Sequence, residues 1–102
     1  MRLELTNNAN CAVAKLDGEL DEGCVKEVRE KIDKFIAGNH FGQFIFDFSG
    51  VSFMDSTGIG MLLGRYKNLK QLGVPIYISN ARGHVDFILS TAGIYTIMRK
   101  IS

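Results

Sequence analysis

The chain has 102 residues, of which 46% are hydrophobic and 23% are charged, and its formal net charge is +1. This length allows one domain with one hydrophobic core, so we expect residues 1–102 to fold together. The near-neutral charge provides no strong field for attracting nucleic acid, and the basic residues Arg65, Lys67 and Lys70 are predicted on the solvated face of a helix.

The cysteines and the apolar runs narrow the class of protein further. Cys11 and Cys24 form no CxxC pattern and have no histidine at ligand spacing, so we expect no zinc site, no redox pair and no cofactor. The apolar runs are far shorter than the roughly 18 residues that a membrane span needs. The charged, alternating N-terminus, Met1–Leu5, does not resemble a signal peptide. We therefore expect a cytoplasmic protein that does not bind membranes.

The first part of the chain predicts an antiparallel hairpin. Arg2–Thr6 alternates as a short strand, and residues 7–10 (NNAN) have strong turn chemistry. Cys11–Leu16 is the second strand, which we expect to end at Asp17-Gly18. One face of this strand carries Cys11, Val13 and Lys15, and the other face carries Ala12, Ala14 and Leu16.

A helix that runs to about Ala37 is predicted next. We expect Glu19–Glu22 to open this helix, with Asp21 as its N-cap. Gly38-Asn39 should end it. Apolar residues at spacings of three and four predict one buried stripe, formed by Val25, Val28, Ile32, Phe35 and Ile36. Two ion pairs are expected on the wet side, Glu27–Lys31 and Glu30–Lys34.

The middle of the chain predicts a strand, a turn and a second helix. Gln43–Phe48 is a short buried strand, and the polar residues Asp55, Ser56 and Thr57 fall where the following helix begins. Their side-chain oxygens can accept hydrogen bonds from the free backbone N–H groups of a helix start, so Ser56 is either a cap or a functional hydroxyl. The predicted apolar face of this helix carries Ile59, Leu62, Leu63, Tyr66 and Leu69.

Small residues crowd the first half of this second helix. Gly58, Gly60 and Gly64 each cost about 1 kcal/mol of helix stability relative to alanine. Such a sequence needs bare backbone, either for close packing or for the approach of a partner. Met54 and Met61 are predicted to pack in the core or on an apolar rim.

The last third of the chain predicts one more strand and one more helix. Gln71–Gly73 ends the second helix, and Val74–Ser79 is the fourth strand. Val85–Ala92 forms a short helix that Gly93 closes. Ile94–Ile101 is an apolar tail that either packs on the sheet or adds an edge strand.

The order of elements is β-β-α-β-α-β-α, which predicts an α/β fold with one mixed sheet of four to five strands. Connections between parallel strands are right-handed almost without exception. If strands two, three and four are neighbours in the sheet, both crossover helices lie on the same face. We therefore expect helices mainly on one side.

The central segment Phe53–Gly60 (FMDSTGIG), followed by Leu63–Lys67 (LGRYK), resembles the STAS-domain anti-sigma factor antagonists, above all the sporulation type. Three further stretches agree in order: Gly18–Asp21 (GELD), Phe46–Phe48 (FDF) and Ser90–Ile94 (STAGI). The resemblance covers nearly the whole chain and implies the STAS fold. Two departures are the sequence EGC at residues 22–24 and the end at Ser102, which leaves open whether the family's C-terminal helix is present.

The resemblance implies a phosphorylation switch at Ser56. In this family the serine directly after the motif aspartate is phosphorylated by the anti-sigma factor, which is an ATP-dependent serine kinase. The unphosphorylated form binds the anti-sigma factor and frees the sigma factor for transcription, whereas the phosphorylated form does not bind and is restored by a PP2C-type phosphatase. The implied partner-binding residues are Gly18, Glu19, Leu20, Asp21, Asp55, Ser56, Thr57, Gly58 and Gly60. We expect a regulator and not an enzyme, as a monomer or weak dimer.

Three other interpretations compete with this one. An aspartyl-phosphate receiver would use Asp55, but it needs an acidic pair after the first strand and a late lysine, which the sequence does not convincingly supply. An enzyme with Ser56 as nucleophile would need a base, and His40 and His84 lie near turns without an evident acidic partner. The main alternative is a STAS module that acts as a scaffold or ligand sensor without phosphorylation.

Overall fold

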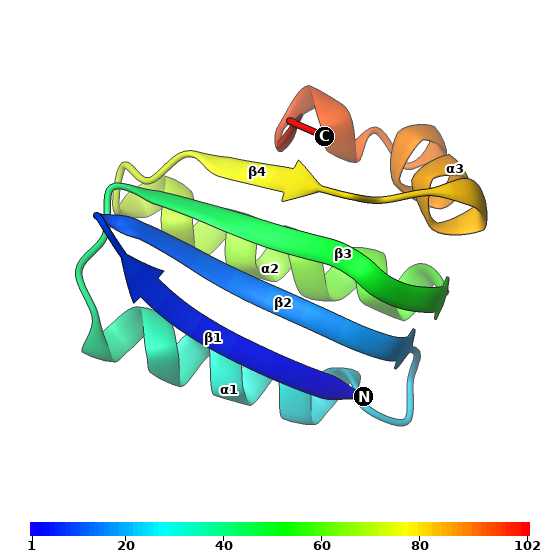
Figure 1. The fold of residues 1–102 in the computed structure, drawn as a ribbon, viewed down its shortest axis with the longest axis horizontal. Coiled ribbons are helices and arrows are strands. Elements are labelled where there is room, and N and C mark those ends of the chain that lie inside the picture. Colours follow the sequence, from blue (N-terminus) through cyan, green and yellow to red (C-terminus); the bar gives the residue numbers. More distant parts are fainter.

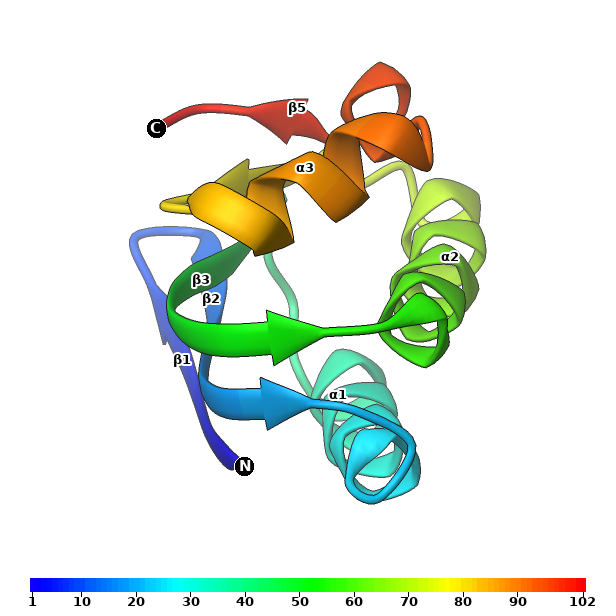
Figure 2. The same ribbon diagram turned by 90° about the vertical axis from the view of Figure 1, so that its right-hand side faces the viewer.

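A computed structural model describes residues 1–102. Its elements are β1 (Arg2–Asn8), β2 (Cys11–Leu20), α1 (Val25–Gly38), β3 (Gln43–Met54), α2 (Ser56–Gln71), β4 (Ile76–Ser79), α3 (Gly83–Thr91), a 3₁₀ turn (Ile94–Thr96) and β5 (Arg99–Lys100). The five strands form one sheet in the order β1-β2-β3-β4-β5, in which β1 is antiparallel to β2 and the others are parallel (Figure 1). Figure 2 shows α1 and α2 together on one side of this sheet. The prediction of a mixed α/β sheet with both crossover helices on one face is confirmed.

The core lies between the sheet and these two helices. Of the two faces expected for β2, the one with Ala12, Ala14 and Leu16 is fully buried. The inward side of β3 carries Phe44 and Phe46, whose rings lie 4.9 Å apart between centroids. Since fully burying a large apolar side chain contributes about 1.5–3 kcal/mol, this aromatic side of β3 is a main source of stability. From α1 the core receives Val28, Ile32 and Ile36.

Both strands that lead to the Ser56 region are longer than predicted. The expectation that Asp17-Gly18 ends β2 is wrong, because β2 continues to Leu20. It pairs there with β3, which continues to Met54 instead of ending at Phe48. Gly18 has φ +119°, and the register of β2 against β3 shifts on both sides of it. The pair Leu20 and Met54 then closes the ladder. Gly18 therefore does not end the strand. It lies at an irregularity of the pairing, beyond which β2 and β3 continue side by side.

Two local boundaries also differ from the sequence-based expectation. β1 extends to Asn8, and a two-residue turn at Ala9-Asn10 follows with φ of 51° and 65°, the conformation that suits the twist of a hairpin. Helix α1 starts at Val25 instead of residues 19–22, and Asp21 is not its cap. Its carboxylate accepts from the Gly23 N–H at 2.9 Å, so Asp21 shapes the loop before the helix.

The buried face of α2 differs from the predicted one. Leu63 is 41% exposed, whereas Arg65 is only 8% exposed, so the expectation that Arg65 is solvated is wrong. Arg65 Nε lies 2.8 Å from Asp33 Oδ1 of α1 and forms an ion pair with it. The two atoms make no hydrogen bond, because the N–H does not point at the carboxylate. Burial lowers the pKa of Arg65 and the Asp33 charge opposes this change. The pair therefore joins the two helices. Met54 and Met61 pack in the core.

The apolar tail combines both of the predicted alternatives. Ile94 and Met98 are buried, and Arg99–Lys100 adds a short strand beside β4. Asp86 of α3 holds this end in place, because its Oδ1 accepts from the Tyr95 hydroxyl at 2.6 Å and from Lys100 Nζ at 2.8 Å. Burial and the hydrogen bond to Asp86 raise the pKa of Tyr95.

Candidate functional site

The candidate site lies at one end of the molecule, where β2 and β3 finish. Because Leu20 and Met54 are register partners, the loop before α1 and the start of α2 begin side by side. Figure 1 shows these two strand ends and α3 at the same end, and Figure 2 looks onto it. We call this end the Ser56 pole. It brings Gly18–Asp21 and Asp55–Gly58, which are distant in sequence, to a common surface.

Ser56 is the first residue of α2 and its side chain is exposed. Its hydroxyl makes no hydrogen bond within the protein, so the interpretation of Ser56 as a cap is wrong. The N-cap is Asp55, whose Oδ1 accepts from the Thr57 N–H at 3.0 Å and also from the Thr57 hydroxyl. The Asp55 carboxylate and the Thr57 hydroxyl are therefore hydrogen-bonded to each other. Ser56 is left as the free hydroxyl of the segment.

The electrostatics of this segment favour an ionised carboxylate beside the serine. The hydrogen bond from the Thr57 hydroxyl is the main cause that lowers the pKa of Asp55, and the backbone N–H groups of Thr57 and Gly58 add to it. No basic side chain contributes to this change. A group attached to Ser56 would therefore lie at the helix N-terminus, beside the negative charge of Asp55.

The two glycines predicted to face a partner have different surroundings. A Cβ added to Gly58 would lie 2.6 Å from Met54 Cγ and 3.2 Å from Leu20 Cδ2, so Gly58 is glycine because α2 packs tightly on the strand ends. Gly60 has open space around the same position. Leu20 is fully buried. Leu20 and Gly58 thus lie inside the core and offer no side chain to a partner, whereas Gly60 lies on the surface.

The loop before α1 supplies the second half of the Ser56 pole. Glu19 is exposed, and Gly18 and Asp21 are half-buried. The Cys24 thiol donates to the Glu19 carbonyl oxygen at 3.2 Å, so this cysteine fastens the loop. The structure therefore brings Gly18, Glu19 and Asp21 to the same end of the molecule as Ser56.

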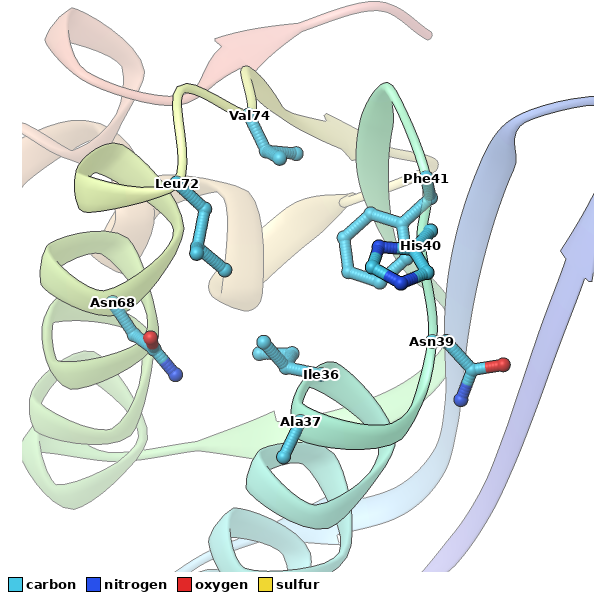
Figure 3. Close-up of a pocket in the computed structure, with 8 residues that line it drawn as sticks. All are labelled: Ile36, Ala37, Asn39, His40, Phe41, Asn68, Leu72 and Val74. Atoms are coloured by element: carbon cyan, nitrogen blue, oxygen red, sulfur yellow. The ribbon is translucent and has the colours of Figure 1, made fainter.

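A cavity of about 380 Å³ lies at the opposite end of the molecule, between the ends of α1 and α2. Figure 3 shows His40, Phe41 and Asn68 among the residues that line it. Ser56 does not line this cavity, and the exposed His40 is too far along the fold to serve as its base. His84, the other histidine, stacks on Phe53 with 5.9 Å between ring centroids and makes no hydrogen bond to Ser56.

No group of three or more His, Cys, Asp or Glu side chains is placed to hold a metal ion. None of the helices combines the length and the apolar character that crossing a membrane would require.

Sequence reasoning missed two exposed aromatic side chains. Phe53 is 38% exposed at the end of β3, and Phe87 on α3 is 65% exposed. The helical spacing of α3 alone places Phe87 opposite Val85 and Leu89, so its exposure was accessible from the pattern. The contact between Phe53 and His84 joins residues distant in sequence, which no local pattern reveals.

Comparison with known proteins places this fold in a family. The STAS domain family matches residues 2–102. The anti-sigma F factor antagonist of Paenibacillus polymyxa is 29% identical over 98 residues, which cover 96% of this chain and 84% of that protein. That of Lysinibacillus sphaericus is 41% identical over 58 residues, which cover 57% of this chain and half of that protein.

Solved structures agree with this assignment. The anti-sigma factor antagonist SpoIIAA in its unphosphorylated form has a TM-score of 0.85 at 28% identity, covering 99% of this chain and 89% of that one. The phosphorylated form of SpoIIAA from Bacillus has a TM-score of 0.76 at 27% identity, covering 99% and 92%. With a matching family, fold and motif, the chain belongs to the STAS domain family and is similar to its anti-sigma factor antagonists.

Proposed function

We propose that the protein is an anti-sigma factor antagonist that is switched by phosphorylation of Ser56. In this proposal residues 1–102 act as one cytoplasmic STAS domain that is not itself an enzyme. The unphosphorylated form binds an anti-sigma factor, which is also an ATP-dependent serine kinase, and so releases a sigma factor for transcription in a sporulation-type pathway. Phosphorylation abolishes binding, and a PP2C-type phosphatase restores it.

The observation that carries the proposal is the free hydroxyl of Ser56 at the start of α2. The hydroxyl is exposed, so an enzyme can reach it. Asp55 caps the helix, so the Ser56 hydroxyl is not bound to the backbone as a cap would be. The relatives support the same function, because they are anti-sigma factor antagonists and one of them, SpoIIAA, is known in an unphosphorylated and a phosphorylated form.

The energetics of a phosphate on Ser56 suit a switch. A phosphoserine carries a charge of about −1.5 to −2 at pH 7, and a helix N-terminus stabilises an anion by about 0.3–1 kcal/mol. Two like unit charges about 5 Å apart repel by about 3 kcal/mol at an effective dielectric near 20. If the partner presents a carboxylate to Ser56, this repulsion alone weakens binding about a hundredfold. The switch then needs no rearrangement of the antagonist.

The surface that binds the partner is proposed to include Glu19, Asp21, Asp55, Ser56 and Gly60, with Gly18 and Thr57 at its edge. Leu20 and Gly58 act indirectly, because they hold the two strand ends and α2 in contact.

Mass spectrometry after incubation with ATP and an anti-sigma factor kinase from the same genome tests the proposal. We expect one added phosphate on wild type and none on Ser56→Ala. Because the Thr57 hydroxyl is bound to Asp55, Thr57→Ala should still accept the phosphate. Wild type that stays unmodified with every such kinase would contradict the switch.

A STAS module that works as a scaffold or ligand sensor is the second candidate. The fold itself is compatible with it, since a sulfate transporter family protein from Wolinella succinogenes has the same fold with a TM-score of 0.74 at 15% identity. Such a module would remain unmodified in the same assay, and Ser56→Glu would not change its binding.

A further inference from the structure

Phe87 is the most exposed large apolar side chain of the protein, at 65%. It lies on the outer side of α3, whose inner residues Val85 and Leu89 are buried in the core. Burying an aromatic side chain releases free energy, so the exposed Phe87 offers this free energy to a partner that covers it.

The fold does not depend on Phe87. Helix α3 is fixed by its buried face and by Asp86, which binds both the Tyr95 hydroxyl and Lys100. The phenyl ring of Phe87 takes part in no ring stacking within the protein, unlike the rings of Phe35, Phe41 and Phe44.

Phe87 lies on the helix whose His84 contacts Phe53, a residue just before the Ser56 segment. The His84 ring stacks on Phe53 with an interplanar angle of 23°, and Phe87 lies one helical turn after His84 on the outer side of α3. Phe53 precedes Ser56 by only three residues. We name Phe53, His84 and Phe87 the α3 patch. In Figure 2 helix α3 crosses directly beside the end of β3 that leads into α2.

We propose that the α3 patch is part of the docking surface for the anti-sigma factor kinase, with Phe87 inserting into an apolar pocket of that partner. This inference rests on the proposed function. The occupant is the kinase because Phe53 of the patch lies three residues before the serine that the kinase must reach. A rigid aromatic side chain at such a surface is the kind of residue that dominates binding energy.

The patch also explains how one partner can be both held and released. Apolar contact through Phe87 is independent of the charge on Ser56, so it supplies affinity to the unphosphorylated form. A phosphate then opposes that affinity by charge repulsion. In this proposal Phe87 supplies binding energy, and the phosphate on Ser56 causes release.

Titration calorimetry with an anti-sigma factor kinase from the same genome tests this inference. Of these kinases, the one that binds the wild-type protein most tightly is used. We expect Phe87→Ser to weaken binding about tenfold or more, and Phe87→Leu to stay within about threefold of wild type. The matched control is Leu72→Ser, which removes a 59% exposed apolar side chain at the opposite end and should bind like wild type. Equal melting temperatures of the variants verify that folding is unchanged.

Ser56→Glu, measured in parallel, separates this inference from the proposed function. If Ser56→Glu abolishes binding while Phe87→Ser binds like wild type, the inference is overturned and the proposed function stands. If Ser56→Glu binds like wild type, the switch itself fails. If sedimentation shows that Phe87→Ser only removes self-association of the free protein, the patch is a contact between copies of this chain and the inference is again overturned.

Discussion

Asp55 and Ser56 are adjacent, yet they have separate roles in the structure. The carboxylate of Asp55 is bound to the Thr57 N–H and hydroxyl, whereas the hydroxyl of Ser56 is free. From the sequence either residue was a possible cap, since both have the required oxygen at the start of a helix. The backbone decides between them, because Asp55 has the extended conformation of a cap and Ser56 is already helical.

Asp55 should make the stability of the protein depend on pH. Its pKa is lowered in the folded state, so its ionised form contributes stability above the ordinary aspartate pKa, about 3.9. That contribution is lost as the pH falls through the lower folded pKa. Thermal unfolding between pH 2 and 7 should therefore show a smaller loss at acid pH for Asp55→Asn, which keeps an acceptor oxygen but does not titrate. A loss equal to that of wild type would show that Asp55 is not coupled to folding.

At the scale of elements, the packing of α2 on the strand ends can be tested with two glycines. Gly58→Ala should destabilise the protein by about 1–3 kcal/mol, because the new methyl group would clash with Met54 and Leu20. Gly60→Ala, two residues on in the same helix, should stabilise it by up to about 1 kcal/mol, because its surroundings are open. Urea denaturation measures both. Equal effects would mean that Gly58 is not a packing residue.

Elements defined by local pattern were predictable, and those that depend on distant contacts were not. The buried alternation of Ala12, Ala14 and Leu16 follows from the period of a strand. The continuation of β2 past Gly18 depends on pairing with β3, and the burial of Arg65 depends on Asp33 of another helix. An apolar pattern counts Arg65 as solvent-facing, because it does not include the carboxylate that makes burial tolerable.

At the scale of the whole molecule, the handedness of the crossovers predicted both helices on one face on the condition that β2, β3 and β4 are neighbours, and the sheet order meets this condition. The sequence also predicted that Ser56 begins the central helix. What it left undecided is which neighbouring residues share the surface with it. Burial removes Leu20 and Gly58 from that surface, and the contact between Phe53 and His84 shows that α3 lies beside the end of β3.

Phosphorylation should leave the fold of the whole molecule nearly unchanged. The Ser56 hydroxyl takes part in no hydrogen bond, and it follows the end of β3, whereas the buried Phe44 and Phe46 lie at the start of that strand. Amide NMR spectra of the two forms should differ mainly at residues 53–60 and in the adjoining loop before α1. Shifts spread through the core strands would contradict a switch that acts by charge alone.

Asp55 caps α2 while the hydroxyl of Ser56 stays free, and this separation of roles has a consequence for the amount of protein in the cell. Because the residue that caps α2, Asp55, is not the one that would be modified, the two forms should unfold with nearly the same free energy. Proteolysis follows the unfolded population, so both forms would be degraded at the same rate. The total amount of antagonist would then stay constant while the ratio of its forms changes, and a signal could be reversed without new synthesis.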